Sequence, residues 1–203
     1  MKHLIIYAHP NKESLNHLFK QTVEEYLKEQ NHEVIVRDLY QIRFNPVLSL
    51  TDINGQHTGI HCQDVKEEQQ HITWADVITF VYPIWWTGMP SIMKGYIDRV
   101  FSYGFAYRYD QGIQKGLLTG KSVYIINSQG KSKSEYKAIG MNKALKLTSD
   151  KGIFLYCGLT IKKHFFFDQA DRATAKIIEE WIAEITESYM NEFPAAQNKT
   201  GKI

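Results

Sequence analysis

Two turns in this chain carry side chains whose types and spacing suit the binding of an anion or a flat ring. The first follows the apolar run at 3–8 and contains His9 and Pro10, after which Ser14 and Asn16 stand where an amphipathic helix is expected to begin. The first backbone N–H groups of a helix have no partners within it and carry the positive end of its dipole, so they favour a bound anion. The side chain of Ser14 or of Asn16 can cap the helix and also bond a phosphate oxygen. The alternative interpretation is a capped turn without a ligand.

The second turn places two adjacent tryptophans, Trp85 and Trp86, between Pro83 and Pro90. Two neighbouring tryptophans cannot both pack on one face of a helix or strand, so we expect at least one to line a cleft. A flat, apolar and partly wet surface suits a planar ring such as isoalloxazine, whose polar edge can bond backbone N–H groups of a tight turn. The alternative is that the tryptophans pack beneath the neighbouring helix.

A third polar loop, at 127–130, follows a predicted strand. A glycine at the carboxyl end of a strand lets the backbone approach a ligand closely, and the residues Asn127, Ser128, Gln129 and Gly130 meet this description. Judged alone, this loop is equally consistent with a solvated turn.

Periodicity alternates between strands and helices along the whole chain. Short apolar runs predict buried strands, and apolar residues at helical spacing predict amphipathic helices. The segment from Tyr40 to Gln63 shows no clear period and is predicted to be irregular. The predicted strands are 3–8, 33–39, 76–82, 122–127 and 159–167, and the predicted helices are 15–30, 65–74, one opened by Pro90, 139–151 and 171–192. The run 164–167, beginning with His164, is interpreted as buried strand rather than ligand surface.

This alternation predicts an α/β fold: a three-layer, doubly wound arrangement of five parallel strands with right-handed crossovers. In such sheets ligands bind beyond the carboxyl ends of the strands, where the strand order reverses. For the order 2-1-3-4-5, of which flavodoxin with its FMN is the known example, that point lies between strands one and three. The loops 9–16 and 83–90 are expected to meet there. We predict a single domain over 1–203, with 194–203 as a frayed tail.

Composition excludes several classes of function. The net charge is +2 without a dense basic stripe, so nucleic acid is not expected as a partner. No apolar run approaches the roughly 20 residues of a membrane span, so direct membrane insertion is not expected. Two cysteines, Cys62 and Cys157, are too few for a disulfide framework and favour a cytoplasmic location. No metal site is expected, because only His57 and His61 have workable ligand spacing.

Several motifs together resemble the flavodoxin-like NAD(P)H:quinone oxidoreductases, a family that includes quinone reductases, drug-modulator enzymes and flavoprotein subunits of potassium-efflux systems. The resemblance spans nearly the whole chain, and the block at 83–107 is its most specific part. The matching segments are 8–10 with 14–16, 83–86 running into 90–101, 104–107, 117–121 and 157–159.

The resemblance implies a role for each matching position. The flavin's phosphate and ribityl side would be held by His9, Ser14, Leu15 and Asn16. Its ring would be flanked by Pro83, Ile84, Trp85 and Trp86, and its polar edge would meet Asn127, Ser128, Gln129 and Gly130. Tyr136 matches a tyrosine that the larger quinone reductases place near N1 and O2 of the flavin, and it is the one candidate catalytic residue.

The chain also departs from the family pattern. The family loop usually reads Thr-Thr-Gly-Gly where this chain has the 127–130 loop, and the histidine that accompanies the tyrosine is replaced by Asn142. A proton relay through Tyr136 and a histidine is therefore in doubt.

The resemblance implies a flavin-dependent oxidoreductase that passes two electrons by a ping-pong mechanism from NAD(P)H to a quinone or a similar electrophile, including azo or nitro compounds. FMN is favoured slightly over FAD because the chain lacks the long C-terminal extension of the larger enzymes. A homodimer is expected. The alternative is a regulatory flavoprotein that binds a partner such as a potassium-efflux transporter.

Overall fold

Five parallel strands form the central sheet, in the order β2-β1-β3-β6-β7. This computed structural model describes residues 1–195, so most of the predicted tail at 194–203 lies outside the described residues. The order is the predicted 2-1-3-4-5, which confirms the flavodoxin-like, doubly wound arrangement. The strands are β1 (Lys2–Tyr7), β2 (Glu33–Asp38), β3 (Val77–Pro83), β6 (Ser122–Ser128) and β7 (Thr160–Phe167).

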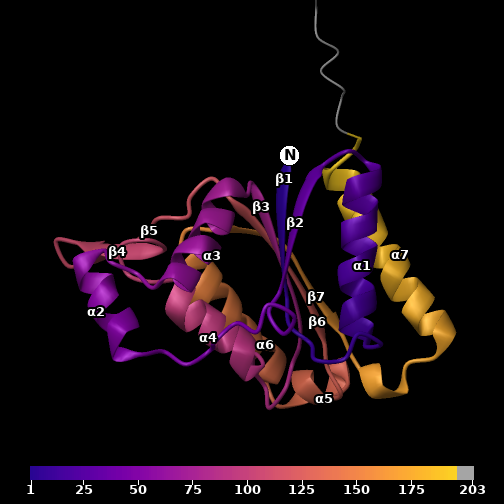
Figure 1. The fold of residues 1–203 in the computed structure, drawn as a ribbon. Coiled ribbons are helices and arrows are strands. Elements are labelled where there is room, and N and C mark those ends of the chain that lie inside the picture. Colours follow the sequence, from indigo (N-terminus) through magenta and orange to yellow (C-terminus); the bar gives the residue numbers. More distant parts are fainter. Residues whose placement is uncertain (196–203) are drawn as a thin grey trace, which may run out of the picture.

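Helices cover both faces of the sheet because successive strand residues point to opposite sides. Ile5 and Tyr7 of β1 face one apolar cluster, and Leu4 and Ile6 face the other. Figure 1 shows α1 and α7 on one side and α3, α4 and α6 on the other. The bounds are α1 (Leu15–Glu29), α3 (Gln63–Trp74), α4 (Ser91–Val100), α5 (Lys133–Ala138), α6 (Met141–Lys146) and α7 (Ala175–Glu192). Within 1–195, no helix has the length and apolar character needed to cross a bilayer.

The segment 40–63 is not irregular throughout, which corrects the sequence prediction. It contains the helix α2 (Leu50–Thr58), which begins with a reciprocal capping box between Ser49 and Asp52. Its polar and glycine residues hide the helical period. This helix and a two-stranded hairpin, β4 (Tyr107–Asp110) with β5 (Ile113–Gly116), lie on the same flank of the molecule (Figure 1).

The predicted helix 139–151 is also corrected. Gly140 has a positive φ of 76° and separates α5 from α6, which continues as a π-helical segment at Leu147–Leu155. The last predicted helix starts later than expected, because a 3₁₀ turn at Ala170–Arg172 precedes α7.

A buried arginine fastens the 45–64 segment to the domain. Arg99 of α4 is 4% exposed and pairs with Asp52, which is 3% exposed, and with Asp64. Burial alone would raise the pKa of Asp52, but hydrogen bonds from Arg99 and Ser49 outweigh it and lower this pKa to about 2. Gly95 permits the close approach, since a Cβ there would lie 2.2 Å from the Pro46 carbonyl oxygen.

Replacing Arg99 should therefore lower the free energy of unfolding. Arg99→Met leaves the Asp52 carboxylate buried without its cation, and we expect a loss of about 3–5 kcal/mol in the free energy of unfolding. The control Lys28→Ala breaks an exposed ion pair with Glu24 and should cost about 0.3–0.5 kcal/mol. Urea unfolding followed by circular dichroism measures both, and equal effects for the two variants would contradict the structural role of Arg99.

Candidate functional site

A cleft of about 370 Å³ opens at the carboxyl ends of β1, β3 and β6. Ten of the twelve residues predicted to bind a cofactor line it, and Trp86 and Asn127 do not. The lining residues are His9, Ser14, Leu15, Asn16, Pro83, Ile84, Trp85, Ser128, Gln129 and Gly130, together with Ala170 and Asp171.

Hydrogen bonds between the loops hold this cleft together. The Ile84 N–H donates to the Ser128 carbonyl oxygen at 2.8 Å, which joins the second loop to the third. The Asn16 Nδ2 group donates to the Ser128 Oγ at 2.7 Å, which joins the first loop to the third. The three loops are separated by up to 112 positions in sequence and form one continuous rim.

One end of the cleft is the start of a helix. Ser14 is the N-cap of α1, with extended backbone angles (φ −77°, ψ 155°), and its Oγ accepts from the His17 N–H at 3.2 Å. The first turn of α1 therefore offers its positive dipole end to the cleft, which favours a phosphate or another anion. The helix begins at Leu15 as predicted, and of the two candidate caps, Ser14 and Asn16, it is Ser14 that caps it.

Two buried acceptors in the cleft have no hydrogen-bond partner among the described residues. They are the Asn16 Oδ1 and the Gln129 Oε1, in residues that are only 3% and 4% exposed. Buried polar atoms in folded proteins are nearly always paired, because an unpaired one loses its hydrogen bond to water. Both residues line the cleft, where a bound ligand can supply the missing donors. Four other unpaired atoms among the described residues belong to side chains outside the cleft lining: both ring nitrogens of His3, the Tyr7 hydroxyl and the His17 Nδ1.

The turn with the two tryptophans is strained. Trp85 and Gly88 exchange two backbone hydrogen bonds of 3.0 Å, and the residues between them, Trp86 and Thr87, have φ of 49° and 59°. Such a turn favours Asn-Gly, and non-glycine residues with positive φ carry a steric cost. Strain of this kind concentrates at functional sites. Trp86 is 100% exposed, so it does not pack beneath the neighbouring helix.

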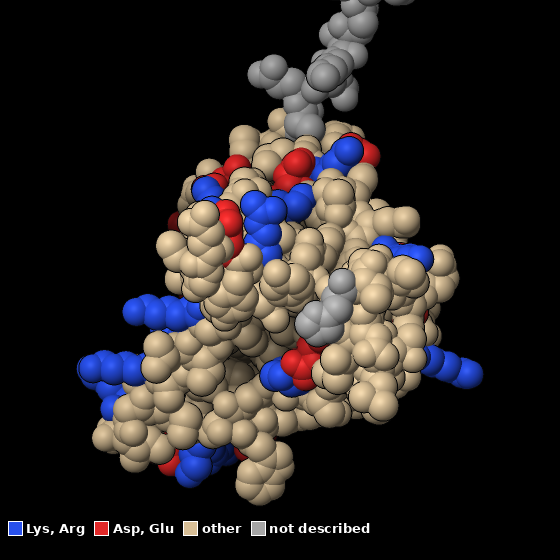
Figure 2. Space-filling view, turned by 90° about the vertical axis from the view of Figure 1, so that its left-hand side faces the viewer, with Lys and Arg blue, Asp and Glu red and all other residues tan. Residues whose placement is uncertain are grey.

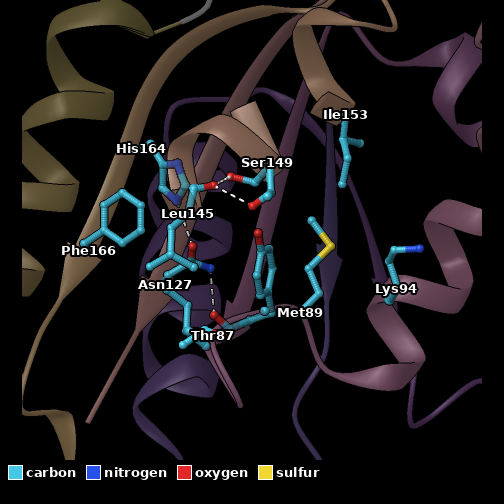
Figure 3. A pocket seen from close by; sticks show the side chains of 13 residues that line it. Thr87, Met89, Lys94, Asn127, Leu145, Ser149, Ile153, His164 and Phe166 are labelled. Carbon is cyan, nitrogen blue, oxygen red and sulfur yellow. Dashed lines mark hydrogen bonds between the residues drawn. The ribbon is translucent and has the colours of Figure 1, made fainter. Parts of the chain in front are cut away.

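A second pocket, of about 360 Å³, lies on the other side of Ile84. Figure 3 shows Asn127, Ser149 and His164 on one side of it and Met89 and Ile153 on the other. The sequence interpretation of His164 as a buried strand residue is confirmed, but its side chain also forms part of this pocket wall. The two-residue alternation in β7, which puts His164 and Phe166 on the same face, is the signal that points to it.

The pocket contains a chain of buried hydrogen bonds. The His164 ring bonds Asp150 through Nδ1 at 2.8 Å and Asn127 through Nε2 at 2.7 Å, and the Asn127 Nδ2 donates to the Tyr82 carbonyl oxygen at 2.9 Å. Burial lowers the pKa of His164, and Asp150 opposes this effect. Burial also raises the pKa of the Tyr82 hydroxyl. Asn127 thus lies in this pocket rather than in the cleft.

The candidate catalytic residue Tyr136, and Asn142, which replaces the family's histidine, lie outside the cleft lining. Tyr136 is half-buried on α5, and Asn142 is exposed on α6. Conversely, Ala170 and Asp171 line the cleft without having been predicted. Their place just after β7 is the signal that points to them, because all five strands of a parallel sheet end at the same edge.

Comparisons with known proteins identify the family and several relatives of this chain. The model of a protein family with the flavodoxin-like fold matches residues 1–189. An uncharacterized NAD(P)H oxidoreductase of Haemophilus influenzae is 41% identical over 160 residues, covering 78% of this chain and 79% of the relative. The NAD(P)H dehydrogenase (quinone) 1 of Rattus norvegicus is 31% identical over 178 residues, covering 78% of this chain and 65% of the relative. The solved NAD(P)H:quinone oxidoreductase of Methanothermobacter marburgensis is 25% identical, with a TM-score of 0.85, covering 95% of this chain and 98% of that chain.

The strained turn generates a prediction about stability. Thr87→Gly removes a Cβ at a position with positive φ, and we expect the free energy of unfolding to rise by about 0.5–1 kcal/mol. The control Thr186→Gly makes the same change inside α7, where glycine is unfavourable, and should lower stability. If Thr87→Gly also lowers the free energy of unfolding in urea, the turn is not strained.

Proposed function

This chain belongs to the family with the flavodoxin-like fold, and we propose that it is a flavin-dependent NAD(P)H oxidoreductase that reduces quinones. One observation carries the proposal: three loops meet in a single cleft that combines a helix N-terminus with two unpaired buried acceptors. A flavin mononucleotide has the matching parts, an anionic phosphate, a hydroxylated chain and a flat ring. The relatives described above are oxidoreductases by name, which supports the same reaction class.

The residues of the cleft fit FMN. Ser14 and the first turn of α1 would hold its phosphate, and the free oxygens of Asn16 and Gln129 would accept hydrogen bonds from it. Pro83, Ile84 and Trp85 line the cleft and would flank its ring, and the exposed Trp86, which does not line the cleft, would contact the ring only once it is bound. When bound, the flavin supplies the hydride and electron chemistry, while the protein binds, orients and shields it from water. FAD is the alternative, and mass spectrometry of the cofactor released on denaturation distinguishes the two.

When the bound flavin is reduced, its ring would gain negative charge, and a hydrogen-bond donor beside the ring would stabilise that charge. The backbone N–H groups of the third loop are candidates for this donor. The Gln129 N–H already donates to the Phe167 carbonyl oxygen at 2.8 Å. We therefore assign this role to the N–H of Gly130, at the rim of the cleft. Tyr136, which does not line the cleft, stays a prediction as a hydrogen-bond donor.

Purified protein loaded with FMN should oxidise NAD(P)H rapidly when menadione is added. A ping-pong mechanism predicts parallel lines in double-reciprocal plots, since NAD(P)H and the quinone would occupy the same place in turn. Slow turnover, together with co-purification of a transporter, would instead support a regulatory flavoprotein. A protein that takes up no flavin at all would overturn both functions. An azo dye and a nitroaromatic compound, tested in the same assay, define the acceptor range.

The fully exposed Trp86 offers a variant for this assay. Trp86→Ala should weaken FMN binding roughly tenfold through the lost aromatic contact, and leave the stability of the flavin-free protein unchanged. Met190→Ala, which truncates an exposed side chain on α7, is the control and should change neither quantity. Lower stability without a change in FMN affinity would show that Trp86 is structural only.

We also propose that two copies associate through the flank formed by α2 and the β4–β5 hairpin. Large apolar side chains are exposed there, and Figure 2 shows a hollowed surface on that side with mostly uncharged residues around it. Gln56 of α2 and Tyr107 of β4 line one pocket between these elements. The exposed apolar residues are Val47, Leu48, Leu50, Ile53, Ile60, Tyr109 and Ile113. An exposed apolar surface of this kind favours association.

Sedimentation velocity tests this proposal. The wild-type protein should sediment with twice the mass of one chain, and Leu50→Glu, which places a charge on the 77% exposed side chain, should shift it toward one chain mass. Met190→Glu on α7 is the control and should leave the mass unchanged. A wild-type protein with the mass of one chain would contradict the dimer.

We propose the cytoplasm as the location, since NAD(P)H is supplied there and both cysteines are free thiols.

A further inference from the structure

We propose that His164, held by Asp150, is a positioning residue that orients the Asn127 amide and thereby fixes the two loops that would flank the flavin ring. The inference rests on the proposed function for the identity of the ligand. It concerns side chains that do not line the cleft, so they act on the ligand through the loops alone.

Asn127 joins the bases of both loops. It is the first residue of the third loop, 127–130, and its Nδ2 group donates at 2.9 Å to the carbonyl oxygen of Tyr82, which precedes the second loop at Pro83. Next to this bond, the Ile84 N–H donates to the Ser128 carbonyl oxygen. Two hydrogen bonds therefore fix the spacing between the loops, and one of them depends on how the Asn127 amide is turned.

His164 determines that orientation. Its Nε2 lies 2.7 Å from the Asn127 Oδ1, and its Nδ1 lies 2.8 Å from the Asp150 Oδ1. Asp150 is kept in place by a hydrogen bond from the Ser149 Oγ at 2.7 Å. With the opposite amide orientation, the Asn127 Oδ1 would face the Tyr82 carbonyl oxygen, and two acceptors would repel each other. The observed orientation is therefore the one that completes every bond in this chain.

Both partners of the His164 ring are acceptors, so both hydrogen bonds form only when both ring nitrogens carry a proton. The neutral ring has one bare nitrogen. Because the Asp150 carboxylate is the stronger acceptor, the proton stays on Nδ1, and the bare Nε2 then faces the Asn127 Oδ1. Turning the amide relieves this repulsion, but it gives up the bond to the Tyr82 carbonyl oxygen. The protonation state of His164 thus decides whether the two loops stay joined at Asn127.

The groups around the His164 ring determine its pKa, and with it the pH at which the Asn127 amide turns. Asp150 faces it from the π-helical segment, Lys146 lies near it at the end of α6, and Phe166 stacks on it with ring centroids 3.9 Å apart. Tyr82 of β3 contacts the same Asn127. Burial lowers the pKa of His164 below its ordinary value of 6.5, Asp150 raises it and Lys146 lowers it further. The joined arrangement is therefore present in acid and is lost as the pH rises through the His164 pKa.

FMN affinity measured against pH tests the inference. We compare dissociation constants from flavin fluorescence quenching between about pH 5 and pH 8 for the wild-type protein and His164→Gln. The wild type should bind about three- to tenfold more tightly than the variant at the acid end, the effect of about one hydrogen bond, and the two should converge at the alkaline end. The phosphate of FMN titrates in the same range, so the ratio between the two proteins is the readout.

Two further variants separate positioning from a general structural role. Asp150→Asn removes the carboxylate that raises the pKa of His164, so the pH dependence should move toward acid without disappearing. His71→Gln changes another histidine whose pKa burial lowers, on α3 and away from this pocket, and it should reproduce the wild-type curve. A constant ratio between wild type and His164→Gln at every pH, or an unshifted curve for Asp150→Asn, would overturn the inference.

The flavin-free protein provides a second readout. In ¹⁵N NMR spectra, both ring nitrogens of His164 should carry a proton in acid, and the side-chain amide signals of Asn127 should shift together with the loss of the Nε2 proton. A His164 ring that stays neutral throughout this pH range would contradict the inference. If the protein binds no FMN at any pH, the proposed function fails, while this NMR titration still decides the role of His164.

Discussion

The parallel pairing of β1, β3 and β6 is the constraint on which the rest of the site depends. Strands that run in the same direction end at the same edge, so the loops that follow them meet although they are far apart in sequence. The apolar clusters on both faces of the sheet fix this pairing. The Ser128 residue at the end of β6 then accepts bonds from both other loops, from the Ile84 N–H and the Asn16 side chain.

Several unfavourable features of the structure lie at that edge. Two unpaired acceptors, Asn16 Oδ1 and Gln129 Oε1, and a turn with positive φ at Trp86 and Thr87 all lie at or beside the cleft. Each of these features lowers the stability of the flavin-free protein, and a bound flavin offsets the first of them. Away from the site, a buried charge such as Arg99 has its partners.

Much of the fold and of the cleft could be predicted from sequence, because both follow from local signals. Apolar runs and helical periods located the strands and most of the helices, while the strand order was that of the known flavodoxin-like arrangement. Ser14 and Asn16 marked the helix start. The helix α2 was missed because its polar residues carry no clear period. The partnership of Asn127 with His164 was missed because it joins residues 37 positions apart on neighbouring strands. No local pattern predicts which of two neighbouring polar side chains turns toward a cleft and which turns toward a pocket behind it.

A crystal structure of the protein grown with FMN tests the central claim most directly. The account predicts a phosphate at the N-terminus of α1 and a ring in contact with both the 83–86 and the 128–130 segments, with hydrogen bonds to the Asn16 and Gln129 side chains. An FMN molecule bound elsewhere, or held by one of the three loops alone, would contradict it.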